Sequence, residues 1–444
     1  MAELFDVSLK PIASRNLWIR QTSDGFGLSD VHRGIVADIV EGVRSLKGDK
    51  AAETIARDGL EELHKVIDSV DVGPLRDFVL ERKRRELLHT AVSIGRNVLR
   101  WTDDFYVDDY LILRINFPYE VARNAAPSAE NPGVGRVSPA VREIAKARRV
   151  IDPVYDPKGY HKGHPPAAWA HGPHLDTWGG HSTDGLNIWW AMCEVPAEAS
   201  MVLYPELIGK ELPPEQKTLY LKPGYRLPKP TYLPLAAGEM LVFDPEILHG
   251  THLNVTMHTR VAVSLRLNAR KPSFDPGCFY AREFWHRANA IEAGRYDEVL
   301  HLKREDNLSA PRHAAQIDWP QRLKKIHVRD MREGTAVDVG PSSLVADGER
   351  VVVQLPDRRV LLHRIDGVVR AVDAACPHYG VDLADGGCDR EKLYCPACGI
   401  GFDIVTGKSG APSLWLTGYG VREEGNRIVL DVFADLGAQS ESHL

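Results

Sequence analysis

Hydrophobic residues recur at intervals of three and four over most of the first 105 residues, as in AAETIARDGLEELHKVIDSV and PLRDFVLERKRRELLHTAVSIGRNVLRW. This spacing predicts amphipathic helices, because it places apolar side chains on one face. The period changes to two at YLILRINF, where Leu111, Leu113, Ile115 and Phe117 occupy every second position. A period of two predicts a strand. We therefore expect a helical region, residues 1–105, that packs on a β-rich core.

Four further runs in the middle of the chain predict strands: GLNIWWAMCEV, MVLYPEL, EMLVFDPEILHG and RVAVSLRLN. Turns with proline and glycine separate them, which predicts a β-sandwich or barrel over residues 106–275. Residues 125–172 are rich in proline, glycine and histidine without a sustained period, so we expect a long loop or lid. Helical spacing returns over residues 279–332, and REGTAVDVGPSSL has the composition of a linker. We therefore expect a helical extension and linker over residues 276–335.

The last hundred or so residues again show short strand patterns. RVVVQL, RVLLHRI and VVRAVD are separated by turn residues, and NRIVLDVF follows Gly425. Asp366-Gly367 lies between two apolar runs, which predicts a tight hairpin turn. The expected fold class is mainly β with flanking helices, and it includes a small all-β domain over residues 336–444.

The composition narrows the class of protein. With 444 residues, 43% hydrophobic and 26% charged, the chain is ordered and globular, not disordered or fibrous. Acidic residues outnumber basic ones by 61 to 55 and no basic stripe is present, which argues against a nucleic-acid partner. The sequence starts without a secretion-signal pattern, and no apolar run reaches about 18 residues. We expect a cytoplasmic protein with no membrane partner.

The six cysteines are unevenly spaced. So few in so long a chain do not form the disulfide framework of a small secreted domain. Two stand alone and four fall in one short stretch: Cys193 and Cys278, then Cys376, Cys388, Cys395 and Cys398. The stretch indicates a metal site near the C-terminus.

A second candidate metal site lies in the run HLDTWGG. His174 and Asp176 are two residues apart, so on an extended strand both side chains leave the same face. His249, 75 residues later, follows the apolar strand EMLVF and can supply a third ligand. Two imidazoles and one carboxylate leave positions open on Fe(II) for a chelating cosubstrate and dioxygen. Arg260 opens the next strand, where its guanidinium can pair with a carboxylate.

Other residues compete with these assignments. Four more histidines are alternative ligands by residue type: His171, His181, His252 and His258. Arg260 could instead form a surface salt bridge. Arg114, Asn116 and Asn187 are polar residues within apolar strands, so they could contact a substrate or lie on a solvated outer face.

The run HLD, then LNIWWAM, then LAAGEMLVFDPEILHGTHLNVTMHTRVAVSLRLN resembles the phytanoyl-CoA dioxygenase-like branch of the Fe(II)/2-oxoglutarate-dependent oxygenases. The resemblance implies a double-stranded β-helix, of the jelly-roll or cupin-like kind, over residues 106–275. It also implies that His174, Asp176 and His249 hold Fe(II), that Arg260 binds the far carboxylate of 2-oxoglutarate, and that Trp189 lies beside this cosubstrate. Relatives that halogenate lack the carboxylate, so Asp176 favours hydroxylation or another oxidation through a ferryl.

The C-terminal stretch CPHYGVDLADGGCDREKLYCPACGIGFDIVTG holds Cys376-x-His378 and, after sixteen intervening residues, Cys395-x-x-Cys398. Two short loops that each carry two such ligands form a metal site that chance rarely produces. Together with the later LTGYGVREEGNRIVLDV, the stretch resembles the Rieske-type ferredoxin domain. The resemblance implies a [2Fe-2S] cluster within residues 336–444.

One ligand position departs from that family's pattern. Cys398 stands where the family has histidine, so the implied cluster would have Cys376, His378, Cys395 and Cys398 as ligands. A thiolate in place of an imidazole adds negative charge, which lowers the reduction potential. A structural Zn(II) on the same residues and an empty relic of the fold are the alternatives. Cys388 is a further thiol in the stretch.

Taken together, the two resemblances imply an Fe(II)/2-oxoglutarate-dependent dioxygenase that oxidises a small molecule with O2. The substrate classes considered are a natural-product intermediate, an amino-acid derivative and a sugar-like metabolite. The C-terminal domain would supply electrons, dock a ferredoxin reductase or other redox partner, or give structural support. The alternatives are a Rieske-type non-haem iron oxygenase that uses NAD(P)H-derived electrons, and a non-catalytic redox or metal sensor.

Overall fold

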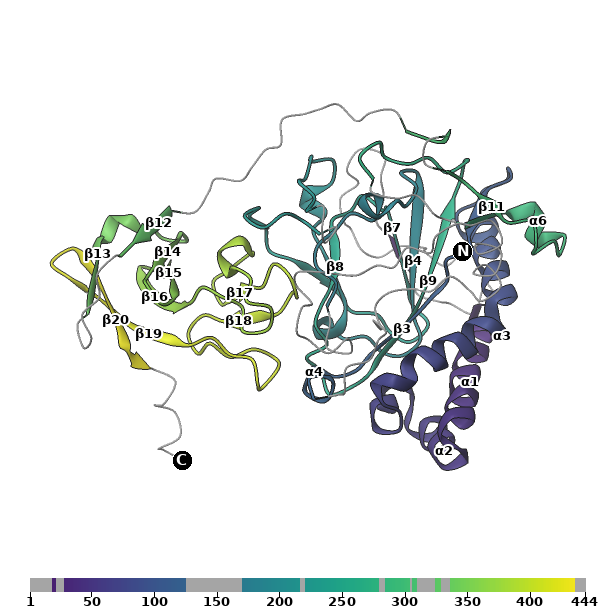
Figure 1. The fold of residues 1–444 in the computed structure, drawn as a ribbon, viewed down its shortest axis with the longest axis horizontal. Helices are drawn as coiled ribbons and strands as arrows, with labels where there is room; N and C mark the ends of the chain where they lie inside the picture. Colours follow the sequence, from purple (N-terminus) through teal and green to yellow (C-terminus); the bar gives the residue numbers. More distant parts are fainter. Residues whose placement is uncertain are drawn as a thin grey trace.

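The structure is a computed structural model, and it describes residues 18–20, 28–124, 170–215, 220–278, 284–303, 306–309, 324–328 and 336–435. Residues 125–169 of the expected loop or lid lie outside this described part. A helical layer, a β-rich centre and a second β region follow one another across the molecule (Figure 1). Among the described residues, no helix combines the length and apolar character needed to cross a bilayer.

The predicted N-terminal helices are present. They are α1 (Leu28–Lys47), α2 (Asp49–Asp58) and α3 (Val72–Ser93), and the shorter α4 (Tyr119–Ala122) follows later. Helix α1 buries Leu28, Ile35, Ile39 and Val43 along one stripe, as its spacing predicts. Helices α1 and α3 cover one face of the central sheet (Figure 1).

The centre consists of two antiparallel sheets. The larger has the order β1-β7-β4-β9-β2-β10-β11, with β3 also paired to β9, and the smaller has the order β6-β5-β8. Their bounds are β1 (Trp18–Arg20), β2 (Tyr106–Asp108), β3 (Ile112–Asn116), β4 (Gly185–Ala191), β5 (Met201–Leu203), β6 (Thr231–Leu233), β7 (Met240–Phe243), β8 (His249–Thr251), β9 (Arg260–Asn268), β10 (Phe284–Arg287) and β11 (Leu300–His301).

Alternation along the strands divides the core in two. On β4, Ile188 and Trp190 pack with the helices, whereas Trp189 packs inward with Leu203 and Phe243 of the other strands. The inner cluster joins side chains of both sheets, so the two sheets face each other across it. This arrangement confirms the predicted double-stranded β-helix core.

The expected helical extension is largely wrong for the described residues. Between residues 284 and 328 they form one short helix, α6 (Ala288–Glu292), together with strands β10, β11 and β12 (Lys324–His327). Strand β10 pairs with β2, and Trp285 lies opposite Asp108. A partner strand from a distant part of the chain overrides the local helical spacing.

The C-terminal domain is a seven-stranded sheet with a separate hairpin. The sheet order is β12-β14-β15-β16-β19-β20-β13, and β17 pairs with β18. Asp366 and Gly367 both have positive φ, 49° and 79°, as the predicted hairpin turn requires. The bounds are β13 (Val337–Pro341), β14 (Arg350–Gln354), β15 (Arg359–Ile365), β16 (Val368–Asp373), β17 (Lys392–Tyr394), β18 (Gly401–Asp403), β19 (Gly418–Glu424) and β20 (Arg427–Asp435).

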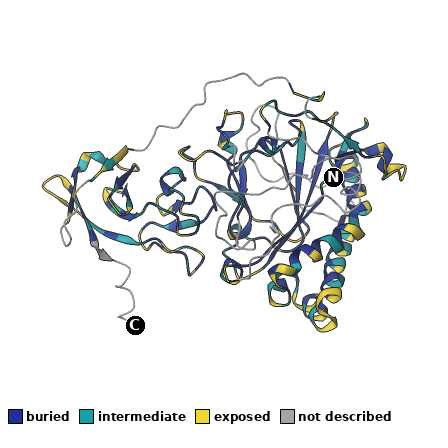
Figure 2. Cartoon of the chain, in the orientation of Figure 1, coloured by how far each residue is buried: buried dark blue, intermediate teal, exposed yellow. Residues whose placement is uncertain are grey.

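The cysteine loops of this domain pack against the centre of the molecule. The sheet of the domain has its own hydrophobic core, which includes Val351, Val353 and Leu362. Cys376 and Phe402, in contrast, belong to the same buried cluster as the helical layer and the central sheet. Buried residues occur both in the central sheets and in the loops around β17 and β18 (Figure 2).

Candidate metal centres

The structure brings His174, Asp176 and His249 together. His174 pairs with the first residue of β8 through two backbone hydrogen bonds, from its N–H to the His249 carbonyl at 2.8 Å and back at 3.1 Å. Asp176 begins a short 3-10 helix and donates its backbone N–H to the Pro245 carbonyl at 3.0 Å. One ligand atom from each of the three side chains lies within 4.8 Å of the other two.

Backbone carbonyls fix the orientation of both imidazole rings. Nδ1 of His174 lies 2.8 Å from the Gly172 carbonyl, and Nδ1 of His249 lies 2.9 Å from the Ile247 carbonyl. A carbonyl only accepts, so each Nδ1 carries the proton and each Nε2 keeps a lone pair. These Nε2 atoms face Asp176, at 3.4 Å from His174 and 3.7 Å from His249. Histidine ligands to metals are held in this way.

The protonation states also suit a metal. Burial lowers the pKa of His249 to about 4, so its ring is neutral near pH 7. Burial opposes the ionisation of Asp176, but the imidazoles of His181, His249 and His174 hold the pKa of its carboxyl well below the usual value. Neutral imidazole and ionised carboxylate are the forms that bind a cation, so the donor set fits Fe(II).

Asn187 orients the carboxylate. Its Nδ2 donates to Oδ2 of Asp176 at 2.6 Å, from a position on β4 opposite Arg266 of β9. The strand pattern alone assigned Asn187 to a substrate contact or to a solvated outer face, and it gave no sign of this role. Its contact with Asp176 depends on a loop and a strand that meet in the fold, although only eleven residues separate them.

Arg260 and Trp189 form a buried pair on the inner side of the central sheet. The guanidinium donates to the Ala199 carbonyl at 2.5 Å and to Oδ1 of Asn116 at 2.7 Å, and its carbon lies 5.9 Å from the Trp189 ring centroid. Burial, reinforced by nearby Arg114, lowers the pKa of Arg260 to about 9, so it stays charged near pH 7.

This pair presents two donors. Nε of Arg260 and Nε1 of Trp189 are both buried and have no hydrogen-bond partner among the described residues. A buried donor without an acceptor is costly, so the pair is suited to an acceptor such as a carboxylate. The surface salt-bridge alternative for Arg260 is wrong, because this residue is only 2% exposed.

Arg114 and Asn116 lie on β3 beside the same strand, β9. Nε of Arg114 donates to Oγ of Ser264 at 3.1 Å, and Asn116 holds Arg260. Burial and Arg266 lower the pKa of Arg114 to about 10, while Asp176 opposes this effect. Asn116 and Asn187 are 4% and 7% exposed, so the solvated outer face is excluded for both.

The four competing histidines lie outside the three-residue group. His171 has its ring centroid 5.5 Å from that of His174, and His181 has Nδ1 3.6 Å from Oδ2 of Asp176. His252 packs against Tyr232, and His258 is exposed beside Glu62. Burial lowers the pKa of His181 to about 3, which keeps this ring neutral beside the carboxylate.

The second group consists of three buried thiols from two turns. Cys376 follows β16, and Cys395 and Cys398 lie in the turn between β17 and β18. The sulfur atoms of Cys376 and Cys398 are 3.9 Å apart, and all three sulfurs lie within 4.8 Å of one another. Two ligands of one tetrahedral metal with bonds of about 2.3 Å lie about this far apart. Cys388 is outside the group.

The thiols need a cation to ionise together. Burial and hydrogen bonding with Cys376 raise the pKa of Cys395 and of Cys398 well above the usual value. Burial also opposes ionisation of Cys376, but hydrogen bonds from the other two thiols and from the Tyr379 backbone hold its pKa well below the usual value. Three thiolates in one buried site therefore require the positive charge of a metal.

His378 lies beside this group without belonging to the close trio. It is buried, and its ring stacks on Tyr379 with centroids 3.8 Å apart. Its assignment as the fourth ligand stays a prediction.

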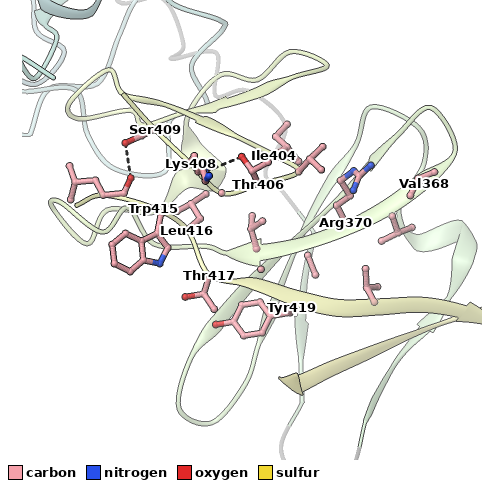
Figure 3. Close-up of a pocket in the computed structure, with 18 of the residues that line it drawn as sticks. Val368, Arg370, Ile404, Thr406, Lys408, Ser409, Trp415, Leu416, Thr417 and Tyr419 are labelled. Carbon is pink, nitrogen blue, oxygen red and sulfur yellow. Dashed lines mark hydrogen bonds between the residues drawn. The ribbon is translucent and has the colours of Figure 1, made fainter. Parts of the chain in front are cut away.

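A large cavity lies on another part of the C-terminal domain. It has a volume of about 1010 Å³, and Arg370, Lys408, Trp415 and Tyr419 are among its lining residues (Figure 3). None of the metal-ligand candidates lines it.

Two family models match separate segments of the chain. Residues 116–262 match phytanoyl-CoA dioxygenase (PhyH), and residues 335–413 match the Rieske [2Fe-2S] domain. The first segment contains the histidine–carboxylate group and the second contains the three thiols.

Known proteins resemble parts of the chain. It is 27% identical over 88 residues to the ferredoxin component of the naphthalene 1,2-dioxygenase/salicylate 5-hydroxylase systems of Ralstonia sp, covering 19% of this chain and 85% of that protein. A solved ferredoxin from Sphingomonas yanoikuyae B1 is 29% identical, with a TM-score of 0.21 and coverage of 22% of this chain and 98% of that one. The solved non-heme alpha ketoglutarate dependent epimerase SnoN from nogalamycin biosynthesis is 13% identical, with a TM-score of 0.24 and coverage of 45% and 60%. A segment similar to phytanoyl-CoA dioxygenase and a segment similar to the Rieske [2Fe-2S] domain follow each other in this one chain.

Proposed function

We propose that the protein is a 2-oxoglutarate-dependent oxygenase that hydroxylates, or otherwise oxidises, a small metabolite or natural-product intermediate. The observation that carries the proposal is the convergence of two Nε2 atoms and one carboxylate, from His174, His249 and Asp176, within the β-helix. Bound Fe(II) and 2-oxoglutarate would supply the oxidising chemistry, with O2 as oxidant. The chain itself supplies the ligand atoms and fixes their orientation.

Each residue then has a defined task. His174 and His249 donate Nε2 lone pairs, because their Nδ1 protons are held by backbone carbonyls. Asp176 offers one carboxylate oxygen, while its other oxygen accepts the hydrogen bond from Asn187. This hydrogen bond limits rotation of the carboxylate, so the donor atoms are in place before the metal arrives.

Arg260 and Trp189 bind the cosubstrate. The Nε–H of Arg260 and the Nε1–H of Trp189 donate to the far carboxylate of 2-oxoglutarate. Asn116 and the Ala199 carbonyl hold the remaining guanidinium nitrogens, so the charge stays fixed on the inner side of the sheet. Arg114 contacts the substrate from β3.

The C-terminal domain supplies electrons. Cys376, Cys395 and Cys398, with His378, would hold a [2Fe-2S] cluster, which would accept electrons from an external ferredoxin reductase or similar donor. The match of residues 335–413 to the Rieske model supports this assignment. The close packing of the three sulfurs supports Zn(II) as a second candidate at the same residues.

The test is a comparison of cosubstrates in protein reconstituted with iron. We expect O2-dependent conversion of 2-oxoglutarate to succinate, which His174→Ala reduces to background because a ligand is lost. His258→Ala is the matched control, since that ring is 57% exposed and lies outside the site. Turnover that needs NAD(P)H and a reductase, without 2-oxoglutarate, would contradict the proposal and favour a Rieske-type oxygenase. Absence of both activities would favour a sensor.

A further inference from the structure

The cysteine site is in direct contact with the catalytic β-helix. Leu253 donates its backbone N–H to the Cys398 carbonyl at 2.9 Å, and Tyr232 donates its hydroxyl to the Gly399 carbonyl at 2.5 Å. A Cβ on Gly399 would lie 2.7 Å from a methyl of Val202. The loop that holds the thiols thus approaches the β-helix as closely as a bare backbone allows.

Tyr379 joins this site to the segment that leads to His174. Its backbone hydrogen-bonds with the Cys376 thiol and its ring stacks on His378. Its hydroxyl accepts the Ala170 N–H at 2.8 Å and lies 3.4 Å from the Ala170 carbonyl. One side chain therefore contacts both the cysteine site and the catalytic domain.

The four residues that follow Ala170 are fixed along their length. His171 donates its backbone N–H to Oγ1 of Thr251 at 2.7 Å and accepts the Thr251 N–H at 3.0 Å. The ring of His171 lies between neighbours, with centroids 5.5 Å from His174 and 6.0 Å from Tyr220. A continuous run of covalent bonds, hydrogen bonds and ring contacts thus extends from Cys376 to the first iron-ligand candidate.

We propose that Tyr379 and residues 170–174 form an electron-transfer path within one chain, from the cysteine site to the histidine–carboxylate site. The inference rests on the proposed function, because both sites must hold redox-active metal. Its consequence is that the protein restores its own ferrous state after an oxidation that was not coupled to substrate.

The electron balance is simple. One electron leaves the reduced cluster, which is oxidised by one unit, and one ferric ion becomes ferrous. No bond forms or breaks, and no proton is required. The cluster is reduced again by an external one-electron donor of the flavoprotein or ferredoxin class, and dithionite or a photoreduced flavin replaces that donor in the experiment.

The experiment follows this electron in the full-length, reconstituted protein. The mononuclear iron is poised ferric, the cluster is reduced by a short pulse from photoreduced flavin, and rapid-freeze electron paramagnetic resonance records both signals. We expect the two signals to decay together in a fast phase whose rate is independent of protein concentration. Tyr379→Leu removes the ring and the hydroxyl, so we expect loss of the fast phase. Tyr379→Phe keeps the volume and removes only the hydroxyl contacts with Ala170, so we expect partial loss.

Tyr232→Phe is the matched control, because it also removes a hydroxyl contact between the domains, and we expect its fast phase to be unchanged. Metal and sulfide content and far-ultraviolet circular dichroism verify that each variant is loaded and folded. An unchanged fast phase in loaded Tyr379→Leu would overturn the inference and assign the transfer to the backbone contact between Cys398 and Leu253. A rate that rises with protein concentration, or a cysteine site that takes up only zinc, would also overturn it.

The failure of the proposed function would look different. Succinate formation is measured in the same wild-type sample, and its absence despite rapid transfer between the metals would reject the oxygenase alone. Transfer that is insensitive to Tyr379, in a protein that still forms succinate, would reject the path alone.

Discussion

At the scale of single residues, hydrogen bonds to the side chains of the iron-ligand candidates set the geometry of the site. Each imidazole loses its freedom to flip because a backbone carbonyl binds its Nδ1 proton. The carboxylate of Asp176 is held in the same sense by Asn187. Such contacts keep the ligand atoms close together before a metal binds. The ligand side chains therefore lose less conformational freedom on binding.

Asn187→Ala should therefore weaken metal binding. The variant removes the 2.6 Å hydrogen bond to Asp176 and leaves all three ligand candidates in place. We expect the affinity for Fe(II) to fall by about 10- to 100-fold, which is the usual effect of losing an outer-shell partner. Anaerobic titration against a competing chelator measures it.

Asn97→Ala is the control for this prediction. Its side chain is exposed on the helical layer, where it donates a hydrogen bond to Oγ of Ser93, so the Fe(II) affinity should not change. Equal affinities for wild type and Asn187→Ala would show that the carboxylate needs no such support.

At the scale of elements, strands β4 and β9 each face the site on one side and pack against the helical layer on the other. On β9, Arg260 and Ser264 face the site while Val261 and Val263 pack with the helical layer. The period of two makes this division automatic, because successive side chains leave opposite faces. A one-residue slip of β9 would exchange Arg260, the proposed cosubstrate ligand, with a core valine.

At one contact between loops of the two domains, the backbones lie so close that an added Cβ atom would not fit. A Cβ on Gly387 would lie 2.3 Å from the Pro228 carbonyl oxygen and 2.7 Å from Cα of Lys229. Both are backbone atoms, which cannot move aside as a flexible side chain can. Gly387→Ala should therefore destabilise the protein by about 1–3 kcal/mol, as overpacking of a tight contact does. Urea denaturation measures the change.

Gly34→Ala is the matched substitution. The atom nearest to its Cβ is Nζ of Lys83, at 3.0 Å, which is the end of a flexible side chain. We expect a neutral or stabilising effect of up to about 1 kcal/mol, because alanine favours a helix more than glycine does. If Gly387→Ala and Gly34→Ala changed the free energy of unfolding equally, the loops around Gly387 would be able to separate without loss of stability.

At the scale of the whole molecule, buried histidines on both domains couple stability to pH. Burial lowers the pKa of His252, beside the domain contact, and of His363, on β15, to about 4 in each case. The unfolded chain protonates these rings below its ordinary pKa of about 6.5, whereas the folded protein does so only near 4. The contribution of these two neutral rings to the free energy of unfolding is therefore fully present above pH 6.5. It is lost progressively as the pH is lowered from 6.5 toward 4.

Denaturation in urea at a series of pH values tests this prediction. The midpoint should fall as the pH drops through this range, and His363→Gln should make the fall shallower because one group no longer takes up a proton on unfolding. An identical pH slope in wild type and His363→Gln would rule out a contribution from this ring.

The local sequence predicted those features that depend on neighbouring residues. The period of three and four in the first hundred residues predicted α1 to α3, and Asp366-Gly367 predicted the turn between β15 and β16. It did not predict the described residues 284–303 and 324–328, which form strands β10, β11 and β12 and one short helix, α6. The reason is that β10 has a partner, β2, almost two hundred residues away in the chain.

Side-chain chemistry and spacing alone determined that His174, Asp176 and His249 could form one group and that three cysteines could form another. Only the tertiary structure decided which histidines lie outside the group, which side chain holds Asp176, and that the thiols are buried in one cluster with the helical layer and the central sheet. The physical reason is the distance along the sequence between the residues that interact. Periodicity and spacing report which face a residue occupies, whereas a hydrogen bond such as that between Tyr379 and Ala170 exists only after the chain has closed a loop of more than two hundred residues.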